Sequence, residues 1–571
     1  IMRIKHFFGL AVLAAMTASC SSNNELVNGG NGSGENETGV GYASFSINLP
    51  TTSGTRADGD PTFEDGTASE YKVNDATLLI FKKGETTKEG DYTFVESAEL
   101  GSMAPWKDPS ETGVTTHAKI TAKLESVNKN DNNFALVLLN NGTGTNAKVA
   151  MPSVGEKFSV WNAQPTGKFA KPENGFYMAN APLFKDNNVT TLVPIESSKI
   201  YSTEEEAAKN AATDIYVERG LAKVTLGKGT TTEKPVTSDT YQGDKVTISK
   251  WVLDVTNQKA YPIHNVDGLT TDYPEIWKND ATATTAPSTQ RFVDNSKATA
   301  KRVYWGKDPN YDKNDLRNTD EAGKTAREAE FNYVANKDVT EDPAKPLYCL
   351  ENTFNLDNMM QGQTTRIVFK ATYKPASLPE GETTFYKIGK NTAIWREADL
   401  KKEIEAAVAS VVSGAAGKTT VTLNAKGNDI TAAGTHYITA DNITVTDVEA
   451  ETIENAITAI NTQLGLKETD KVGISTYAGG ESYYVARIKH FGDELTPWSS
   501  GGYGSDNLSF LGRYGMLRNN WYELTVSSVS GPGYPSVPEV KPNTPDDEDD
   551  KYISVSVKIL KWAKRTQDVK L

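Results

Sequence analysis

The stretch Ala43-Ser44-Phe45-Ser46-Ile47-Asn48-Leu49 alternates apolar and polar residues without a break. A period of two is typical of a β-strand that buries one of its faces. Pro50 follows directly and predicts the end of this strand, because proline has no N–H to donate to a sheet. The next segment, 51–66, is polar, contains Arg56 and predicts an exposed loop.

A second stretch near the C-terminus, 553–559, repeats this pattern. Its apolar residues Ile553, Val555, Val557 and Ile559 align with Ala43, Phe45, Ile47 and Leu49, and the polar positions between them align as well. Before it, residues 531–550 are rich in proline and acid and predict an extended, solvated spacer. A strand at the end of such a spacer either folds back as an edge strand of its own domain or serves another chain. The sequence leaves both readings open.

The rest of the chain is predicted to consist mainly of strands, with two amphipathic segments that are predicted to be helices. Further strands are predicted at 77–81, 134–139, 215–226, 245–255, 366–373, 483–489 and 521–528. Turn residues between them, among 45 Gly and 24 Pro, favour antiparallel sandwiches. Because 571 residues exceed one ordinary domain, we expect two β-rich domains. Helices are predicted at 397–412 and 448–464, bracketing an insertion of about 397–470 in the second domain.

The N-terminal residues predict export. Arg3 and Lys5 precede an apolar run, 7–16, which is too short to span a bilayer and is typical of a signal peptide. The run leads to Thr17-Ala18-Ser19-Cys20, and small residues before a cysteine are similar to a bacterial lipobox. In a lipobox, Cys20 is diacylated and becomes the new N-terminus. A plain secretory signal that contains a cysteine is the alternative.

Arg56 is the only Lys or Arg between Lys5 and Lys72. An Arg-specific protease therefore has a single target there, the Arg56-Ala57 bond, in a loop where cleavage is easy. A chance arginine in a linker is the alternative.

Together these features predict an assembly mechanism. The early strand fills a groove in its own domain, where four buried apolar side chains contribute roughly 6–12 kcal/mol before entropy is counted. Its covalent tether gives it an effective concentration of order millimolar, so a free competitor loses. Cleavage removes the tether, and the last strand of another copy enters the groove. Such a head-to-tail contact does not close on itself and makes a fibre.

Other classes of function find little support. The net charge of -14 argues against a nucleic-acid partner, which would need a basic face. Five scattered histidines (6, 117, 264, 436 and 490) form no catalytic or metal-binding motif, so we expect no enzyme, metal or cofactor. Cys349 is expected in the core. Trp251, Trp395, Trp498 and Trp521 could stack on sugars, which keeps a glycan-binding surface lipoprotein as an alternative.

Four stretches carry a family resemblance: Thr55-Arg56-Ala57-Asp58-Gly59-Asp60, then 217–223 (VERGLAK), 250–257 (KWVLDVTN) and 512–522 (GRYGMLRNNWY). On these, the lipobox and the C-terminal strand, the sequence resembles the Bacteroidales fimbrillins, close to the major subunit of the short (minor) fimbriae of Porphyromonas. The resemblance implies a mostly β chain of two transthyretin-like Greek-key β-sandwich domains in tandem. It also implies an outer-membrane lipoprotein precursor, cleavage after Arg56 and polymerisation through the C-terminal donor strand.

The implied organisation is a signal peptide (1–19), a propeptide with the first strand (20–56), an N-terminal sandwich (57–226), a C-terminal sandwich (227–538), and a linker with the donor strand (539–571). Expected partners are other copies and accessory fimbrial subunits head to tail, and an Arg-specific protease, with host or bacterial surface receptors as candidates. The membrane is expected to be met only through the precursor's lipid. The mature form belongs in extracellular fimbriae. A shaft subunit needs both the cleavage site and the last strand, whereas an anchor keeps its lipid and a tip subunit can lack one connector.

Overall fold

The structure is a computed structural model that describes residues 40–50, 67–101, 114–128, 131–186, 188–274, 292, 301–496, 508–547 and 553–560. All of them belong to one compact unit, Gly39–Leu571. Strands dominate, so the mostly β class predicted from the sequence is confirmed. The division into tandem domains near residue 226 stays a prediction.

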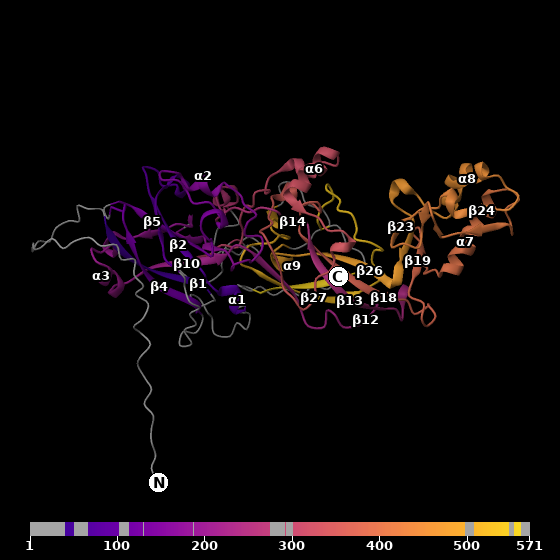
Figure 1. Cartoon of the computed structure of the whole chain (residues 1–571), viewed down its shortest axis with the longest axis horizontal. Helices are drawn as coiled ribbons and strands as arrows, with labels where there is room; N and C mark the ends of the chain where they lie inside the picture. Colours follow the sequence, from indigo (N-terminus) through magenta and orange to yellow (C-terminus); the bar gives the residue numbers. More distant parts are fainter. Residues whose placement is uncertain are drawn as a thin grey trace, which may run out of the picture. The chain divides into compact units, whose positions relative to one another are not determined.

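The first and largest sheet has eight strands (Figure 1). Its order is β3 (Thr93–Glu99), β2 (Ala76–Lys82), β5 (Asn133–Leu139), β6 (Met178–Asn180), β10 (Thr213–Arg219), β1 (Gly41–Pro50) and β4 (Val114–Leu124), with β9 (Val193–Ile195) paired to β5. Its buried side chains form one cluster that runs from Ala43 to Ile263 and includes Leu350. The expected strands at 43–49, 77–81 and 134–139 are β1, β2 and β5.

Two four-stranded sheets face a second core. One has the order β17 (Leu347–Cys349), β11 (Ala222–Leu226), β27 (Trp521–Val529) and β28 (Ile553–Leu560). The other has the order β12 (Lys234–Pro235), β13 (Lys245–Asp254), β18 (Arg366–Lys374) and β26 (Glu481–Arg487). Val224 and Leu524 from one sheet and Trp251 and Phe369 from the other share a single buried cluster. This packing is compatible with a β-sandwich.

The segment 215–226, expected as one strand, is two. β10 ends at Arg219 and β11 begins at Ala222, and the two belong to different sheets. The break falls at Gly220, where a side chain would begin 3.1 Å from the rings of Phe169 and Tyr177. The apolar pattern continues across the break because both strands are buried, so periodicity alone does not reveal the change of sheet.

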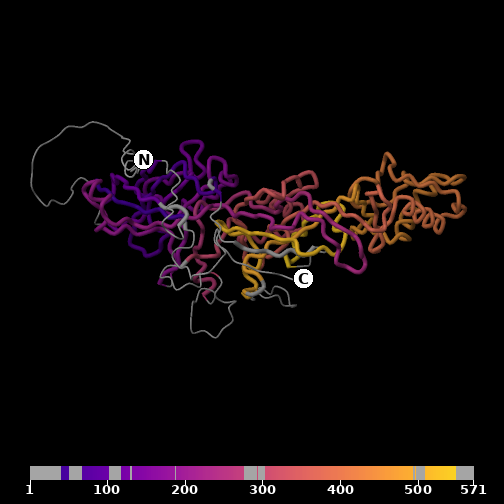
Figure 2. The backbone as a smooth tube through the Cα atoms, turned by 90° about the horizontal axis from the view of Figure 1, so that it is seen from below, coloured from indigo at the N-terminus to yellow at the C-terminus, as the bar shows by residue number. Residues whose placement is uncertain are grey.

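The two expected helices are present as α7 (Glu397–Val411) and α8 (Ala450–Gln463). They pack with small strands around a separate buried cluster that spans Tyr386 to Ile474. The backbone of this segment is orange in Figure 2. These strands are β19 (Phe385–Ile388), β20 (Thr419–Val421), β21 (Asn424–Ala425), β22 (Asn428–Asp429), β23 (Gly434–His436), β24 (Ile443–Val445) and β25 (Ile474–Tyr477). The predicted helical insertion therefore carries its own hydrophobic core.

Short elements complete the fold and were not expected from the sequence. The helices are α1 (Ala68–Tyr71), α2 (Phe158–Asn162), α3 (Glu204–Lys209), α4 (Leu269–Asp272), α6 (Glu321–Glu330) and α9 (Gly492–Leu495). The strands are β7 (Leu183–Lys185), β8 (Asn188–Thr190), β14 (Thr256–Asn257), β15 (Lys301–Arg302) and β16 (Phe331–Asn332). Helix α6 is mostly polar, and its apolar stripe consists only of the alanines 322, 326 and 329, so it lacks the large apolar residues on which the other helices were predicted.

Candidate functional site

Strand β1 lies inside the first sheet, between β10 and β4 (Figure 1). Phe45 stands opposite Thr213 in a parallel pairing with β10, and opposite Ile120 in an antiparallel pairing with β4. Ala43, Phe45, Ile47 and Leu49 are 0, 0, 1 and 4% exposed. Because β1 stands between its two neighbours, its loss would leave rows of unpaired backbone groups on both of them. That is the geometry of a strand-accepting groove.

The structure does not describe the predicted cleavage and lipidation residues. Cys20, Arg56 and Ala57 lie outside the described residues, so both modifications stay predictions. The described chain resumes at Thr67, whose backbone N–H donates to Glu70 Oε2 at 2.8 Å at the start of helix α1. Any cut at Arg56 would therefore fall between β1 and α1.

Helix α1 is held to the sheets by a buried ion pair. The Glu70 carboxyl is 1% exposed and lies 2.7 Å from Lys223 Nζ of β11. Tyr348 OH of β17 donates to it at 2.6 Å, and Arg219 Nε of β10 donates to the Glu70 carbonyl oxygen at 2.8 Å. Burial acts to raise the pKa of the Glu70 carboxyl, but the hydrogen bonds from Lys223 and Tyr348 outweigh it and lower this pKa. The first described residues after the polar stretch 51–66 are thus fastened independently of β1.

Replacing Lys223 with methionine is expected to destabilise the protein by about 3 kcal/mol or more, because the Glu70 carboxylate stays buried without its cation. Thermal or urea unfolding followed by tryptophan fluorescence measures this. The double variant Lys223→Met/Glu70→Gln is the matched control and should recover part of the loss. Equal unfolding of the single variant and the unmodified protein would show that the pair contributes nothing.

The C-terminal strand β28 is folded back on its own chain. It pairs antiparallel with β27, at the edge of the sheet that contains β11. The register places Ile553, Val555, Val557 and Ile559 opposite Val529, Val526, Leu524 and Tyr522, all of which are buried. Of the two readings left open by the sequence, this chain by itself adopts the edge strand.

The segment before β28 is not a solvated spacer, at least as far as Asp547. Tyr534 and Tyr483 of β26 exchange two backbone hydrogen bonds of 2.8 Å, and Arg366 Nη2 donates to the carbonyl oxygen of Pro538 at 2.6 Å. The prediction of a solvated spacer was wrong for residues 531–547. Composition indicates that a segment forms no helix or strand of its own, but it does not indicate whether the segment packs against the rest of the protein. A proline-rich segment leaves its backbone carbonyl groups without partners of its own. Here Tyr483 of β26 and Arg366 of β18 donate hydrogen bonds to them.

Two acidic residues fasten the end of this segment. Asp546 is fully buried and accepts a hydrogen bond from Thr364 Oγ1 at 2.8 Å. Arg513 Nε donates to Asp547 Oδ1 at 3.2 Å. The body of the protein therefore holds the chain up to Asp547, and β28 begins six residues later at Ile553.

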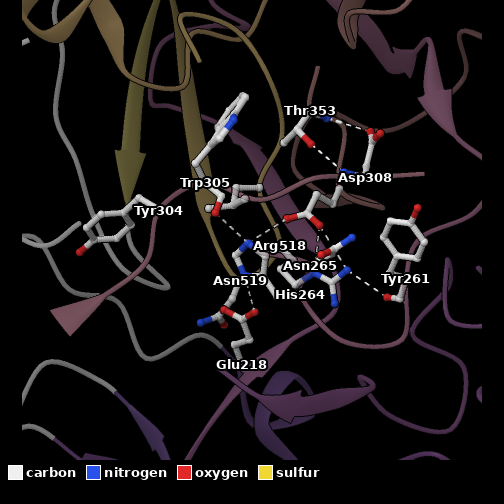
Figure 3. A network of polar contacts seen from close by, with 12 residues as sticks. Glu218, Tyr261, His264, Asn265, Tyr304, Trp305, Asp308, Thr353, Arg518 and Asn519 are labelled. Carbon is white, nitrogen blue, oxygen red and sulfur yellow. Dashed lines mark hydrogen bonds and ion pairs between the residues drawn. The ribbon is translucent and has the colours of Figure 1, made fainter. Parts of the chain in front are cut away.

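Two of the stretches that carried the family resemblance, 217–223 and 512–522, contribute residues to a buried polar network (Figure 3). His264 Nδ1 lies 2.8 Å from Glu218 of β10, and Arg518 Nη2 lies 3.2 Å from Glu351. Arg518 also donates to the carbonyl oxygen of Tyr261 at 3.0 Å. Glu218 belongs to the 217–223 stretch and Arg518 to the 512–522 stretch. His264 Nε2 also lies 3.7 Å from Glu351 Oε1, so the network joins β10 of the first sheet to the segment that leads into β27.

The residues considered for chemistry are packed instead. Burial raises the pKa of the Cys349 thiol to about 12, so this residue stays protonated and unreactive. His490 is 3% exposed between Tyr522 OH and the carbonyl oxygen of Tyr304. Trp251 is fully buried, and Lys223 Nζ lies 3.7 Å above the Trp521 ring. Trp498 is outside the described residues.

Two kinds of special site are absent from the part of the chain that the structure describes. Among the residues that the structure describes, no three His, Cys, Asp or Glu side chains are grouped so that they could hold a metal ion. Within those same ranges, no helix combines the length and the apolar character needed to cross a membrane.

Comparison with known families points to the class of protein. Residues 475–568 match the family model described as "Major fimbrial subunit protein type IV, Fimbrillin, C-terminal". The matched region contains β26, β27, the fastened segment 531–547 and β28. This match supports a fimbrillin, a structural subunit of fimbriae at the cell surface. No curated protein matches the chain.

Proposed function

We propose that the chain is the shaft subunit of a fimbrium, resembling those of the Bacteroidales, that polymerises by protease-triggered strand exchange and supports adhesion. The precursor would travel as an outer-membrane lipoprotein attached through Cys20. An Arg-specific protease would cut after Arg56, β1 would leave its groove, and the last strand of the next subunit would take its place.

The observation that carries this proposal is the position of β1. It is an interior strand of the first sheet, yet Arg56, the only Lys or Arg of the sequence between Lys5 and Lys72, belongs to the polar stretch between it and α1. A cut there frees β1 while the Glu70–Lys223 ion pair keeps α1 attached. The remaining sheet would expose backbone donors and acceptors on both sides of an apolar slot.

The folded-back position of β28 fits a subunit before assembly. An edge strand is hydrogen-bonded to one neighbouring strand, whereas the groove offers two, β10 and β4. Transfer of β28 from β27 to another subunit's groove therefore gains one ladder of hydrogen bonds, each contributing about 0.5–1.5 kcal/mol net. The fastened residues up to Asp547 need not move for this exchange.

The N-terminal residue of the protein on cells tests the proposal and separates it from its rivals. Ala57 at the N-terminus of fibre-bound protein supports the shaft role. A lipidated Cys20 on the mature protein would instead indicate a fimbrial anchor or a glycan-binding surface lipoprotein. A tip subunit would start at Ala57 but occupy only one end of each fibre, which immunogold labelling detects.

Replacing Cys20 with alanine is expected to block lipidation and leave the precursor unprocessed or mislocalised. Metabolic labelling with a fatty acid measures this, and Ser19→Ala, which keeps a small residue before the cysteine, is the matched control. Unchanged incorporation of lipid in the Cys20→Ala protein would remove this residue as the acylated one.

A further inference from the structure

The outer face of β1 is covered at one position only among those described. Ser44 is 1% exposed, whereas Ser46 and Asn48 on the same face are half-buried. The cover is helix α3, whose Ala207 is itself fully buried and which contacts both β1 and β4. Ser44 is thus enclosed on the face of the strand that alternation alone would assign to solvent.

Ser44 is enclosed because it makes two hydrogen bonds there. Its Oγ donates to the carbonyl oxygen of Ala207 at 2.7 Å and lies 2.8 Å from Thr121 Oγ1 of β4. A hydroxyl has one proton, so the Thr121 hydroxyl is the donor in the second bond. The Ala207 carbonyl is among the last four of α3, which an α-helix leaves without an intrahelical partner.

Lys119 completes this arrangement from β4. Its Nζ donates to the carbonyl oxygens of Ala208 and Asn210 at 2.8 and 2.7 Å. The C-terminal end of α3 is therefore fixed over the groove by β4 as well as by β1. A strand that replaces β1 meets an acceptor, Ala207, and a donor, Thr121, already in place, with room for a small side chain.

The geometry points to Ser554 as the residue that sets the direction and register of the incoming strand, by taking the place of Ser44 between Thr121 and Ala207. This inference rests on the proposed function and adds a specificity-determining contact to it. Four positions of the groove, those of Ala43, Phe45, Ile47 and Leu49, must also receive apolar side chains. The two demands together can be tested against every placement of the C-terminal strand.

Only one placement in the direction of β1 meets both demands. With Ser554 at position 44, the four apolar positions receive Ile553, Val555, Val557 and Ile559, and the one increase in size is at Ala43. With Ser556 at position 44, Lys561 takes the buried place of Leu49. With Tyr552 at position 44, a phenol must fit beneath α3.

The reversed strand fails in every case. Alternation alone would accept it, because the pattern of 553–559 reads the same from either end. When it covers the same seven positions, Lys558 occupies the enclosed place of Ser44. When a serine is moved there instead, Lys551 falls at the buried place of Leu49 or Ile47. A buried charge without a partner is the costliest of these errors.

Disulfide trapping in the full-length chain reads the register directly. Tyr42 of β1 stands opposite Lys123 of β4, an exposed residue whose replacement costs little. With Ser554 at position 44, Tyr552 takes the place of Tyr42, so Tyr552→Cys should form intersubunit disulfides with Lys123→Cys after processing. Cleavage after Arg56 removes Cys20 with the residues before Ala57, and Cys349 is buried, so neither cysteine competes with the introduced pair. A disulfide from Ser554→Cys to Lys123→Cys, with none from Tyr552→Cys, would overturn the inference.

Serine replacements measure the contact itself. Ser554→Ala should raise the concentration at which half of the processed protein sediments as polymer by about tenfold, because the Ala207 carbonyl loses its donor. Ser556→Ala is the matched control and should change it less than about twofold. Equal effects of the two would overturn the inference. Val557→Asp tests strand exchange itself, separately from the serine contact. If this variant still polymerises, the proposed function has failed.

Discussion

Val557→Asp abolishes polymer formation in the expected outcome, while the subunit keeps its ability to accept a strand. A carboxylate at this position would be buried without a partner, at a cost of at least about 4 kcal/mol, which weakens donation roughly a thousandfold. Ser556→Asp is the matched control, because neighbouring residues of a strand point to opposite faces. Sedimentation of the protease-treated full-length protein measures the loss.

Mixing separates a donor strand from a strand that only completes its own sheet. Val557→Asp protein added to unmodified subunits should cap growing polymers and shorten them, since its groove remains open. The register with β27 places Val557 opposite the buried Leu524, so the variant also loses some pairing within its own chain. A sharp fall in the melting temperature together with unchanged polymer length would show that β28 belongs to its own sheet alone.

Arg56→Ala leaves the surface protein monomeric in the expected outcome. The intact tether keeps β1 at an effective concentration of order millimolar, which gives it an advantage of a hundredfold or more over a free strand. Trypsin treatment of the purified unmodified precursor should remove the residues before Ala57 and start polymerisation. Electron microscopy of cells and sedimentation of purified protein measure the two effects.

Arg56→Lys is the informative control for the protease. Trypsin cuts after either residue, so the purified variant should polymerise after trypsin treatment. On cells, an Arg-specific protease should leave the variant uncut. Normal fibres on Arg56→Ala cells would contradict activation at this bond. Fibres on Arg56→Lys cells, with none on Arg56→Ala cells, would support cleavage at this bond but show that the protease also accepts lysine.

The two strands with matching alternation, β1 and β28, show how far local pattern reaches. Each was predicted within a residue or two of its observed ends, because alternation depends only on one buried face. Helices α7 and α8 were predicted for the same reason, from a period near 3.6. The family resemblance of the C-terminal region was also readable from local stretches.

The sequence did not allow us to predict which elements pair with each strand or cover it. Nothing in 43–49 indicates that β1 pairs in parallel with β10, more than 160 residues away, or that α3 encloses Ser44. The docking of 531–547 was likewise hidden, because its partners Tyr483, Arg366 and Thr364 are remote in sequence. Alternation records which face of a strand is buried and says nothing of what buries it.

The sequence by itself therefore determined where the strands with the clearest alternation lie and which of their residues face a core, and it is the basis for proposing Arg56 as the cleavage site. Only the tertiary structure decided that β1 is an interior strand, that β28 rests on β27, and that one serine on the outer face of β1 is enclosed. The reason is physical: periodicity reflects contacts of a strand with its own face, whereas pairing and covering depend on groups that the fold brings together from distant parts of the chain.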